Sequence, residues 1–455
     1  MIAVKRNNVE IINLIIEYAT KKEVVFDLNE RNKNEFSSLS LAIENESDEV
    51  MKLLIDYANQ HNIVLETTKK DKLGNNTIMN AVLTNDADIV KLLIDYANQQ
   101  NIVLDINEQN KTKVSSIMAA TSQNNTEMVK LLVNYAIEKD ITLDLNAKEK
   151  YGYSTIFLAT EKNNNRITKL FMNYANEHDM VLEITGKDND GWTPLLNANN
   201  TTNNNTEMVR LLLNYADEHD INININEKNK NDWSSLMLAI GNDNIEIVKL
   251  LIEYANKHDI ALDINSKDKY GYSPIYLTTE KNNNEMAKLL IDYSNEHDII
   301  LEITGKDRNE WTPLLNANTT THNNTEMNKL LLNYADEHNI DLNLNEINKD
   351  KWSSLMLAVS NDNVEVIKLL IEYANKHDIT LEINAKNNEG STSVMNAIEN
   401  NNSEIVKLLI DYANSHNITL EVKEEDVDED ENSAELVNLL LDYINQRVNN
   451  LNLNE

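Results

Sequence analysis

Cysteine is absent from the 455-residue sequence, which therefore contains neither a disulfide bond nor a cysteine-based metal site. Proline occurs three times and glycine eight times. No apolar stretch is long enough to cross a membrane as a helix, and residues 1–6 lack the apolar core of a signal peptide. We therefore expect a cytoplasmic or nuclear protein.

Positive charge is scarce. The sequence has 41 lysine and arginine residues against 75 aspartate and glutamate residues, which gives a net charge of −34. Phosphate contacts dominate nucleic-acid affinity, so this surface would repel DNA, RNA and anionic membranes. A protein partner that is basic or neutral fits this charge better than nucleic acid or a membrane does.

One pattern recurs along nearly the whole chain. In residues 245–259, the polar residues Glu246, Lys249, Glu253 and Asn256 form a single stripe on a helix whose remaining surface is largely apolar. The tyrosine of this stretch returns in steps of 39 residues, with two steps of 41, which is the signature of a stacked repeat array. The tyrosines are Tyr18, Tyr57, Tyr96, Tyr135, Tyr174, Tyr215, Tyr254, Tyr293, Tyr334, Tyr373 and Tyr412, with a degenerate copy at Tyr443.

Each repeat predicts two helices. In residues 229–264, a polar turn precedes Ser234 and Ser235, which supply a hydroxyl to cap a short first helix over 236–240. A turn and a second helix to about residue 257 follow, and the alternation in residues 260–264 predicts an extended segment. Two repeats carry two extra residues between their helices, at 199–206 and 318–325.

Two stretches carry a family resemblance. Residues 188–198 read Asp-Asn-Asp-Gly-Trp-Thr-Pro-Leu-Leu-Asn-Ala, and residues 207–213 read Glu-Met-Val-Arg-Leu-Leu-Leu. They resemble the opening and the second helix of the ankyrin repeat. Thr193 as cap with Pro194 at the first helical position fits that pattern, because proline has no N–H to leave unpaired there. The resemblance implies an all-α solenoid of stacked helix-turn-helix repeats with short β-hairpin or extended loops between them.

The chain also departs from that family. Its period is 39 residues instead of about 33, and the surplus lies at the end of the second helix, where Ala255 replaces the family's glycine. The turn glycine of the hairpin is replaced in several repeats, by Asp232, Glu310 and Lys351 for example.

The repeats predict one elongated domain with the following organisation. We expect a partial repeat at residues 1–22, ten ankyrin-like repeats at 23–420, and an acidic loop with a capping half-repeat at 421–455. Residues 150–268 and 269–387 are close copies, since Lys-Tyr-Gly-Tyr-Ser at 150–154 returns 119 residues later. A block of three repeats has been duplicated.

Eight of the nine histidines occupy one position, four residues after the tyrosine. Lys22, Gln100 and Lys139 take this position in other repeats, as expected for a residue facing the negative C-terminal end of a helix. Stacked helices stand about 10 Å apart, which is too far for adjacent histidines to share an ion. We therefore predict a structural role, with no metal ion and no cofactor. The residues are His61, His178, His219, His258, His297, His338, His377 and His416.

A second metal motif is also rejected. Asp426, Asp428 and Asp430 have the spacing of a calcium loop, but Glu431 and Val437 stand where such a loop needs glycine and glutamate. We predict a solvated acidic loop.

An aromatic residue recurs just before the cap of the first helix, and all four tryptophans of the protein are in this position. The resemblance places it near the hairpin tip, beside the concave surface, and aromatic residues are enriched at binding hot spots. The alternative is that each ring covers the end of the neighbouring first helix. Phe36 holds the position early in the chain, and the candidate partner-binding residues are Tyr153, Trp192, Trp233, Tyr272, Trp311 and Trp352.

No arrangement of residues points to catalysis. Carboxylates are spread along the chain without a distinctive acid–base pair, and no Ser/His/Asp constellation stands out. We predict a non-catalytic scaffold that binds a protein on its concave face and has no small-molecule substrate. The competing hypothesis is a structural spacer or rod without a dedicated partner.

Overall fold

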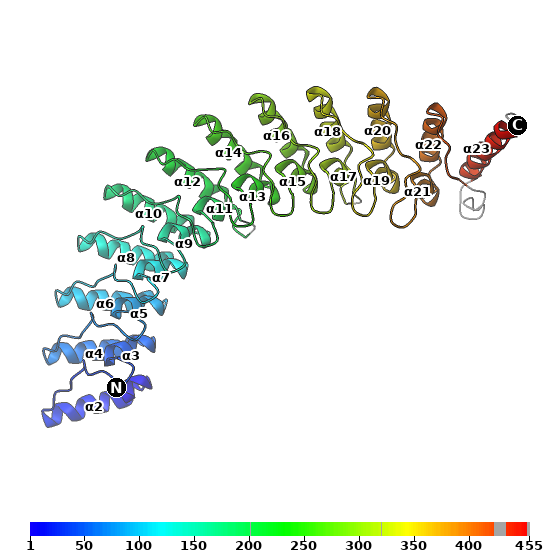
Figure 1. Ribbon diagram of the computed structural model, residues 1–455. Helices are drawn as coiled ribbons and strands as arrows, with labels where there is room; N and C mark the ends of the chain where they lie inside the picture. The colour runs from blue at the N-terminus through cyan, green and yellow to red at the C-terminus, as the bar shows by residue number, and fades with distance from the viewer. Residues whose placement is uncertain (201, 320, 423–433, 453–455) are drawn as a thin grey trace. The chain divides into compact units, whose positions relative to one another are not determined.

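The computed structural model describes residues 1–200, 202–319, 321–422 and 434–452. These residues form 23 α-helices, and an isolated antiparallel bridge joins Ile347 to Ser353. The chain divides into two compact units, Met1–Lys230 and Asn231–Glu455. In both units the helices from α1 to α22 come in pairs, one pair to a repeat (Figure 1). The predicted all-α repeat fold is confirmed.

The helices of the first unit are α1 (Ile2–Lys5), α2 (Val9–Lys22), α3 (Ser38–Glu44), α4 (Asp48–Gln60), α5 (Thr77–Leu83), α6 (Ala87–Gln99), α7 (Ser116–Ser122), α8 (Thr126–Glu138), α9 (Thr155–Glu161), α10 (Asn165–Glu177), α11 (Pro194–Ala198) and α12 (Thr206–Glu218). Those of the second unit are α13 (Ser235–Gly241), α14 (Ile245–Lys257), α15 (Pro274–Glu280), α16 (Asn284–Glu296), α17 (Pro313–Ala317), α18 (Thr325–His338), α19 (Ser354–Ser360), α20 (Val364–Lys376), α21 (Ser393–Glu399), α22 (Ser403–Ser415) and α23 (Ala434–Asn452).

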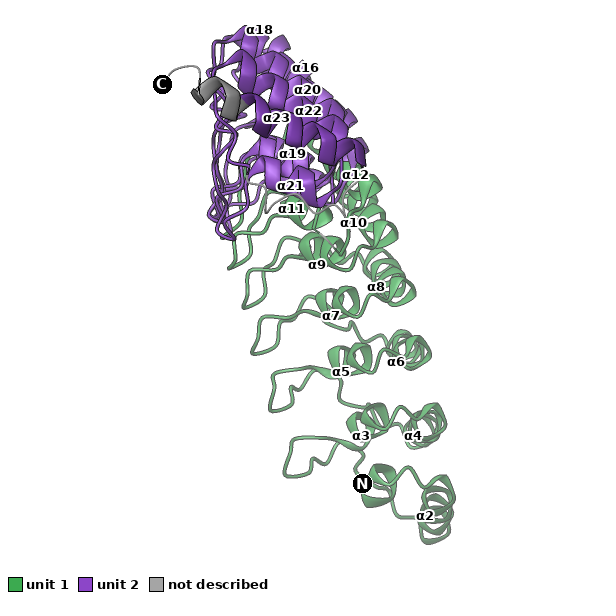
Figure 2. Cartoon of the chain, turned by 90° about the vertical axis from the view of Figure 1, so that its right-hand side faces the viewer, with its two compact units in different colours: residues 1–230 green, residues 231–455 purple. Residues whose placement is uncertain are grey.

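The first unit has three layers. In Figure 2 the hairpin loops of this unit lie on the left, the short first helices in the middle, and the longer second helices on the right. The hairpins and first helices therefore form one continuous face of this unit.

The second helices of both units are amphipathic, as the sequence predicts. In the second unit, α14 buries Ile247, Val248 and Leu251, and Lys249 forms an ion pair of 3.6 Å with Glu246.

Helix starts follow from local caps. The Ser234 hydroxyl accepts a hydrogen bond from the Met237 N–H, and the Thr193 hydroxyl accepts one from the Leu196 N–H, with Pro194 at the first helical position. Each such cap satisfies an N–H group that has no partner within its helix. The predicted caps are confirmed, and so are the longer interhelical loops that follow α11 and α17.

Asparagine and aspartate take the place of glycine at the helix ends. After α14, Asp259 adopts a left-handed conformation (φ 54°), and the Ile260 N–H donates to the Ala255 carbonyl at 2.9 Å. This closes the additional turn that lengthens the repeat. Asn and Asp enter the left-handed region at a lower cost than other non-glycine residues, which explains how so few glycines suffice.

The recurring tyrosine joins successive repeats. The Tyr135 side chain is buried, and its hydroxyl accepts a 2.8 Å hydrogen bond from the Leu104 N–H in the extended segment of the preceding repeat. Equivalent bonds join Tyr96 to Leu65, Tyr174 to Leu143, Tyr293 to Leu262, Tyr334 to Leu301 and Tyr412 to Leu381. A hydroxyl at this depth supplies the partner that the buried backbone N–H requires.

Asparagine side chains form further bridges between repeats. The Asn164 Oδ1 caps α10 by accepting from the Ile167 N–H, while its Nδ2 donates to the Asn124 Oδ1 of the preceding repeat at 2.7 Å. In the extended segments, the Asn146 Nδ2 donates to the Val181 carbonyl and its Oδ1 accepts from the Glu183 N–H. The amide group suits both places because it is donor and acceptor at once.

The last described helix, α23, continues this scheme. Tyr443 is buried, and its hydroxyl accepts a 2.9 Å hydrogen bond from the Leu420 N–H, as in the full repeats. The acidic segment 423–433, with the calcium-like Asp426, Asp428 and Asp430, lies outside the described residues.

Candidate functional site

The aromatic position comes directly after the turn of the hairpin and directly before the cap of the first helix, as Trp192 does between Gly191 and Thr193. An acidic or amide side chain four residues earlier holds the hairpin closed: the Asp188 Oδ1 accepts from the N–H groups of Asp190 and Trp192, each at 2.8 Å. Asp307 holds Trp311 in the same way. The aromatic residue is thereby fixed at the point where the hairpin meets its first helix.

Consecutive hairpins are also bonded to each other. The Asn189 N–H donates to the Tyr151 carbonyl in the first unit, and the Arg308 N–H donates to the Tyr270 carbonyl in the second. Backbone hydrogen bonds of this type align neighbouring aromatic positions within each unit.

All seven aromatic side chains at this position are half-buried. The Tyr153 ring stacks on Phe157 of α9 with centroids 4.7 Å apart, and the Tyr272 ring stacks on Tyr276 of α15 at 5.0 Å. The Trp233 ring lies against Gly241, where an added Cβ would be 3.1 Å from the ring. These rings cover their own first helix, whereas the packing alternative placed each ring on the neighbouring helix. Part of every ring remains open to solvent.

A cleft of about 340 Å³ lies between two of these rings in the first unit. Its walls include Tyr153 and Phe157 from one repeat and Trp192 from the next. Glu161, Lys162, Asp188, Asp190, Asn197, Asn200 and Thr202 complete the lining. The cleft is thus aromatic on two sides and rich in carboxylates.

The carboxylates impose a negative field on the tyrosines. Burial raises the pKa of Tyr153 above its ordinary value, and the carboxylates of Asp188 and Glu161 raise it further. Burial likewise raises the pKa of Tyr272, with Asp307 as the largest charge contribution. Both tyrosines remain neutral at neutral pH, and the negative surroundings favour a cation over an anion beside them.

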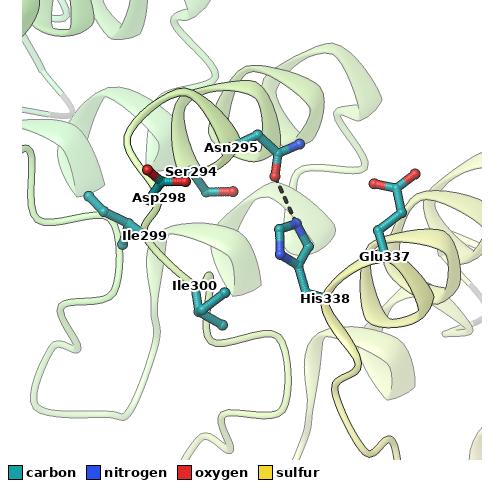
Figure 3. Close-up of a pocket in the computed structure, with 7 residues that line it drawn as sticks. All are labelled: Ser294, Asn295, Asp298, Ile299, Ile300, Glu337 and His338. Atoms are coloured by element: carbon teal, nitrogen blue, oxygen red, sulfur yellow. Dashed lines mark hydrogen bonds between the residues drawn. The ribbon is translucent and has the colours of Figure 1, made fainter.

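The histidine position is occupied by structural contacts. Each ring lies on the tyrosine four residues before it, with centroids 4.2 Å apart for Tyr334 and His338. The Nε2 of His338 is 2.7 Å from the Oδ1 of Asn295 in the preceding repeat (Figure 3). His377 makes the same contact with Asp336 at 2.5 Å. These rings therefore join neighbouring repeats.

Among the residues that the structure describes, no group of three or more His, Cys, Asp or Glu side chains is placed to hold a metal ion. Among the same residues, no helix has the length and hydropathy needed to cross a bilayer.

Sequence reasoning identified the aromatic position but missed the other residues of the cleft. Phe157 follows Tyr153 by four residues, and Asp188 precedes Trp192 by four, so spacing along the helix and hairpin was an available signal. Asn197, on α11, and Thr202, in the loop after it, had no such signal, because their position beside the cleft depends on how α11 packs against the preceding repeat.

Paired helices joined by hairpins define an α-helical repeat protein. The family model for ankyrin repeats, in three copies, matches residues 1–103, 62–142, 156–262 and 322–421, which together cover more than half of the chain. The chain belongs to the ankyrin repeat family. Repeats of this family generally mediate protein–protein interactions.

Many solved structures also match, 549 chains in all. One is the ankyrin repeat domain of Bcl-3, described as a unique member of the IkappaB protein family. It is 19% identical, the match covers 54% of this chain and 95% of that one, and the TM-score is 0.39. No curated protein matches the chain.

Proposed function

We propose that this protein is a non-catalytic scaffold that binds a protein partner on the face formed by its hairpins and first helices, the face expected to be concave. The observation that carries the proposal is the set of half-buried aromatic rings, which hydrogen-bonded hairpins hold in register within each unit. A ring that is anchored on one side and open on the other can bury further area on binding without first losing mobility.

The partner is basic or neutral in charge. The chain carries a net charge of −34, and carboxylates stand beside the aromatic residues, as Asp188 does beside Trp192. A partner of the same sign would be repelled on approach. Nucleic acid and anionic membranes are disfavoured for the same reason.

A structural spacer is the second candidate. The contacts that Tyr153, Tyr272 and Trp233 make with their own first helices favour it, because rings that pack need no partner. The two candidates differ in what the loss of a ring would change: partner binding in one case, and stability in the other.

The test replaces Trp192 and Trp233 with alanine and compares capture of proteins from native extract with the melting temperature. The scaffold proposal expects that a protein captured by the wild-type chain is lost, with a drop in affinity of about 2 kcal/mol or more at a hot spot. Tyr18→Ala is the matched control, since Tyr18 is 62% exposed and lies outside the aromatic row. A clear fall in melting temperature with unchanged capture would favour the spacer.

A further inference from the structure

The cleft between Tyr153 and Trp192 differs from an ordinary surface hollow in its walls. Tyr153 and Phe157 lie nearly parallel, with 4° between their ring planes, and Phe157 is only 4% exposed. Trp192 faces the same cleft from the following hairpin. Aromatic faces carry partial negative charge and attract cations within about 6 Å of the ring centre.

The carboxylates of the cleft are incompletely neutralised by the chain itself. Glu161 is 3.6 Å from the Lys162 ammonium, and Asp190 is 3.0 Å from that of Lys230, but both partners of the second pair are more than half exposed. Exposed pairs of this kind are weak and exchange readily with other charges. The Oδ2 of Asp188 accepts no hydrogen bond from any described residue.

Asn197 adds an independent sign that the site is incomplete. Its side chain is 5% exposed, and its Oδ1 accepts a 2.7 Å hydrogen bond from the Asn200 Nδ2. The Asn200 Oδ1 is itself held by the Asn203 N–H, which sets the orientation of both amides. The Asn197 Nδ2 is left buried without an acceptor among the described residues. Buried donors without partners are rare and call for an acceptor, such as a carbonyl oxygen of a bound segment.

We propose that this cleft binds one cationic side chain, a lysine or an arginine, of the protein partner. The aromatic faces and the free carboxylate oxygen of Asp188 would meet the cation, and Asn197 would meet a carbonyl group next to it. This inference rests on the proposed scaffold function, of which it specifies one contact. The size of the cleft, about 340 Å³, suits a single side chain with adjoining backbone better than a larger ligand.

The duplicated block supplies an internal comparison. At the equivalent place in the second unit, Tyr276 replaces Phe157, and its hydroxyl is 3.5 Å from the Asp307 Oδ2. Asn309 replaces Asp190, and Glu310 replaces the adjacent Gly191. Asn316 replaces Asn197, and its Nδ2 donates to the Thr279 Oγ1 at 3.0 Å, whereas the Asn197 Nδ2 has no acceptor among the described residues. Here the chain satisfies from within the groups that the first cleft leaves open, so we expect only the first cleft to bind a cation well.

The experiment uses the full chain labelled with 5-fluorotryptophan, whose four fluorine resonances are assigned by single Trp→Phe variants. The chain is titrated with N-acetyl-arginine methylamide and, separately, with the neutral citrulline analogue. A saturable shift of the Trp192 resonance with the arginine compound and little shift of the Trp311 resonance are expected. Equal shifts with the citrulline compound would show that charge plays no part and would overturn the proposal.

The matched variant introduces two residues of the second unit's equivalent place into the cleft: Phe157→Tyr with Asp190→Asn. Both new residues already occupy the equivalent positions in the second unit, and circular dichroism confirms that the fold is kept. The arginine compound should bind about tenfold more weakly. Unchanged affinity would contradict the proposal. The reciprocal variant, Tyr276→Phe with Asn309→Asp, should make the Trp311 resonance respond.

The outcome can be separated from that of the scaffold proposal. If the tryptophan variants lose a captured partner but the arginine compound leaves Trp192 unaffected, the scaffold stands and the cation site is wrong. If the arginine compound binds but no captured protein depends on the aromatic residues, the cleft binds cations and the scaffold proposal is wrong.

Discussion

At the scale of single residues, the recurring tyrosine shows why one side chain is repeated so regularly. Its ring fills the core between repeats, and its hydroxyl meets a backbone N–H of the preceding repeat, as Tyr135 meets Leu104. Phenylalanine would fill the same space but leave that N–H without a partner. Tyrosine is therefore favoured over phenylalanine at this position because it avoids the cost of an unpaired buried donor, and not because its ring packs better.

Replacing Tyr135 with phenylalanine should lower the free energy of unfolding by about 1–3 kcal/mol, because the buried Leu104 N–H loses its acceptor. Urea denaturation of the variant and the wild type measures the difference. Tyr18→Phe is the control, since Tyr18 is 62% exposed and its substitution should change stability little. Equal midpoints for Tyr135→Phe and the wild type would show that the hydroxyl bond adds nothing.

A second residue-scale prediction concerns alkaline pH. Burial raises the pKa of Tyr373 to about 12, and the carboxylates of Asp336 and Asp341 contribute to the rise. In the unfolded chain a tyrosine loses its proton near its usual value of about 10, so the unfolded state loses the proton first as pH rises. The free energy of unfolding should therefore fall between about pH 10 and about pH 12. Below about pH 10, the stability that Tyr373 contributes through its raised pKa is fully present. Denaturation midpoints across this range should fall less steeply for Tyr373→Phe.

At the scale of helices and hairpins, each element is completed by its neighbour. Asn164 begins α10 with one end of its amide and joins the preceding repeat with the other. The hairpins are similarly linked, one backbone bond to the next. Secondary structure and repeat stacking are therefore stabilised by the same side chains, as expected where each repeat contacts only its neighbours.

The two ends of the Asn164 amide can be tested separately. Asn164→Ser keeps a capping oxygen, as Ser47 does for α4, and removes the bridge to Asn124; we expect a loss of about 0.5–1.5 kcal/mol. Asn164→Ala removes both, and the lost cap should add about 1 kcal/mol. Thermal and urea denaturation should rank the wild type as the most stable protein, Asn164→Ser as the next and Asn164→Ala as the least stable. If both variants were equally stable, the cap would be irrelevant.

Hairpin glycines allow a matched comparison. Gly271 and Gly390 both have positive φ, 89° and 86°. A Cβ at Gly271 would lie 2.8 Å from the Lys306 carbonyl oxygen, whereas at Gly390 no described atom lies within 4 Å. Alanine should cost about 1–2 kcal/mol of backbone strain at either site, and more at Gly271 because the next hairpin must move. Equal losses in the two variants would exclude a role for close hairpin contact.

At the scale of the whole molecule, charge dominates. Ion pairs do link successive repeats, as between Lys169 and Glu207 at 2.8 Å, but their side chains are about half exposed and contribute little to stability. The large excess of carboxylates thus remains available to repel like charges and to attract a basic partner.

Association with the proposed partner should therefore depend on salt. Raising ionic strength from about 0.01 M to about 1 M shortens the screening length from about 30 Å to about 3 Å, which weakens long-range attraction. We expect the association rate measured by surface plasmon resonance to fall by at least about tenfold, with a smaller change in the dissociation rate. Rates independent of salt would contradict a basic partner.

The sequence by itself determined the elements of this protein. Helix boundaries, caps such as Ser234 and Thr193, and the repeat period depend on interactions within a few residues, and sequence patterns report these directly. Membership in the ankyrin repeat family followed from the same local motifs.

Only the tertiary structure decided how the repeats are joined and what surrounds the aromatic row. The partner of Tyr135 lies 31 residues earlier, and the cleft beside Tyr153 is closed by Asp188 and Asn197 from the next repeat. The recurrence of the tyrosine was visible in the sequence, but its hydrogen-bond partner was not, because that partner is a backbone N–H with no side-chain signature. Whether a ring stacks on its own first helix or on a neighbouring one depends on the packing angle between elements, which no local pattern encodes.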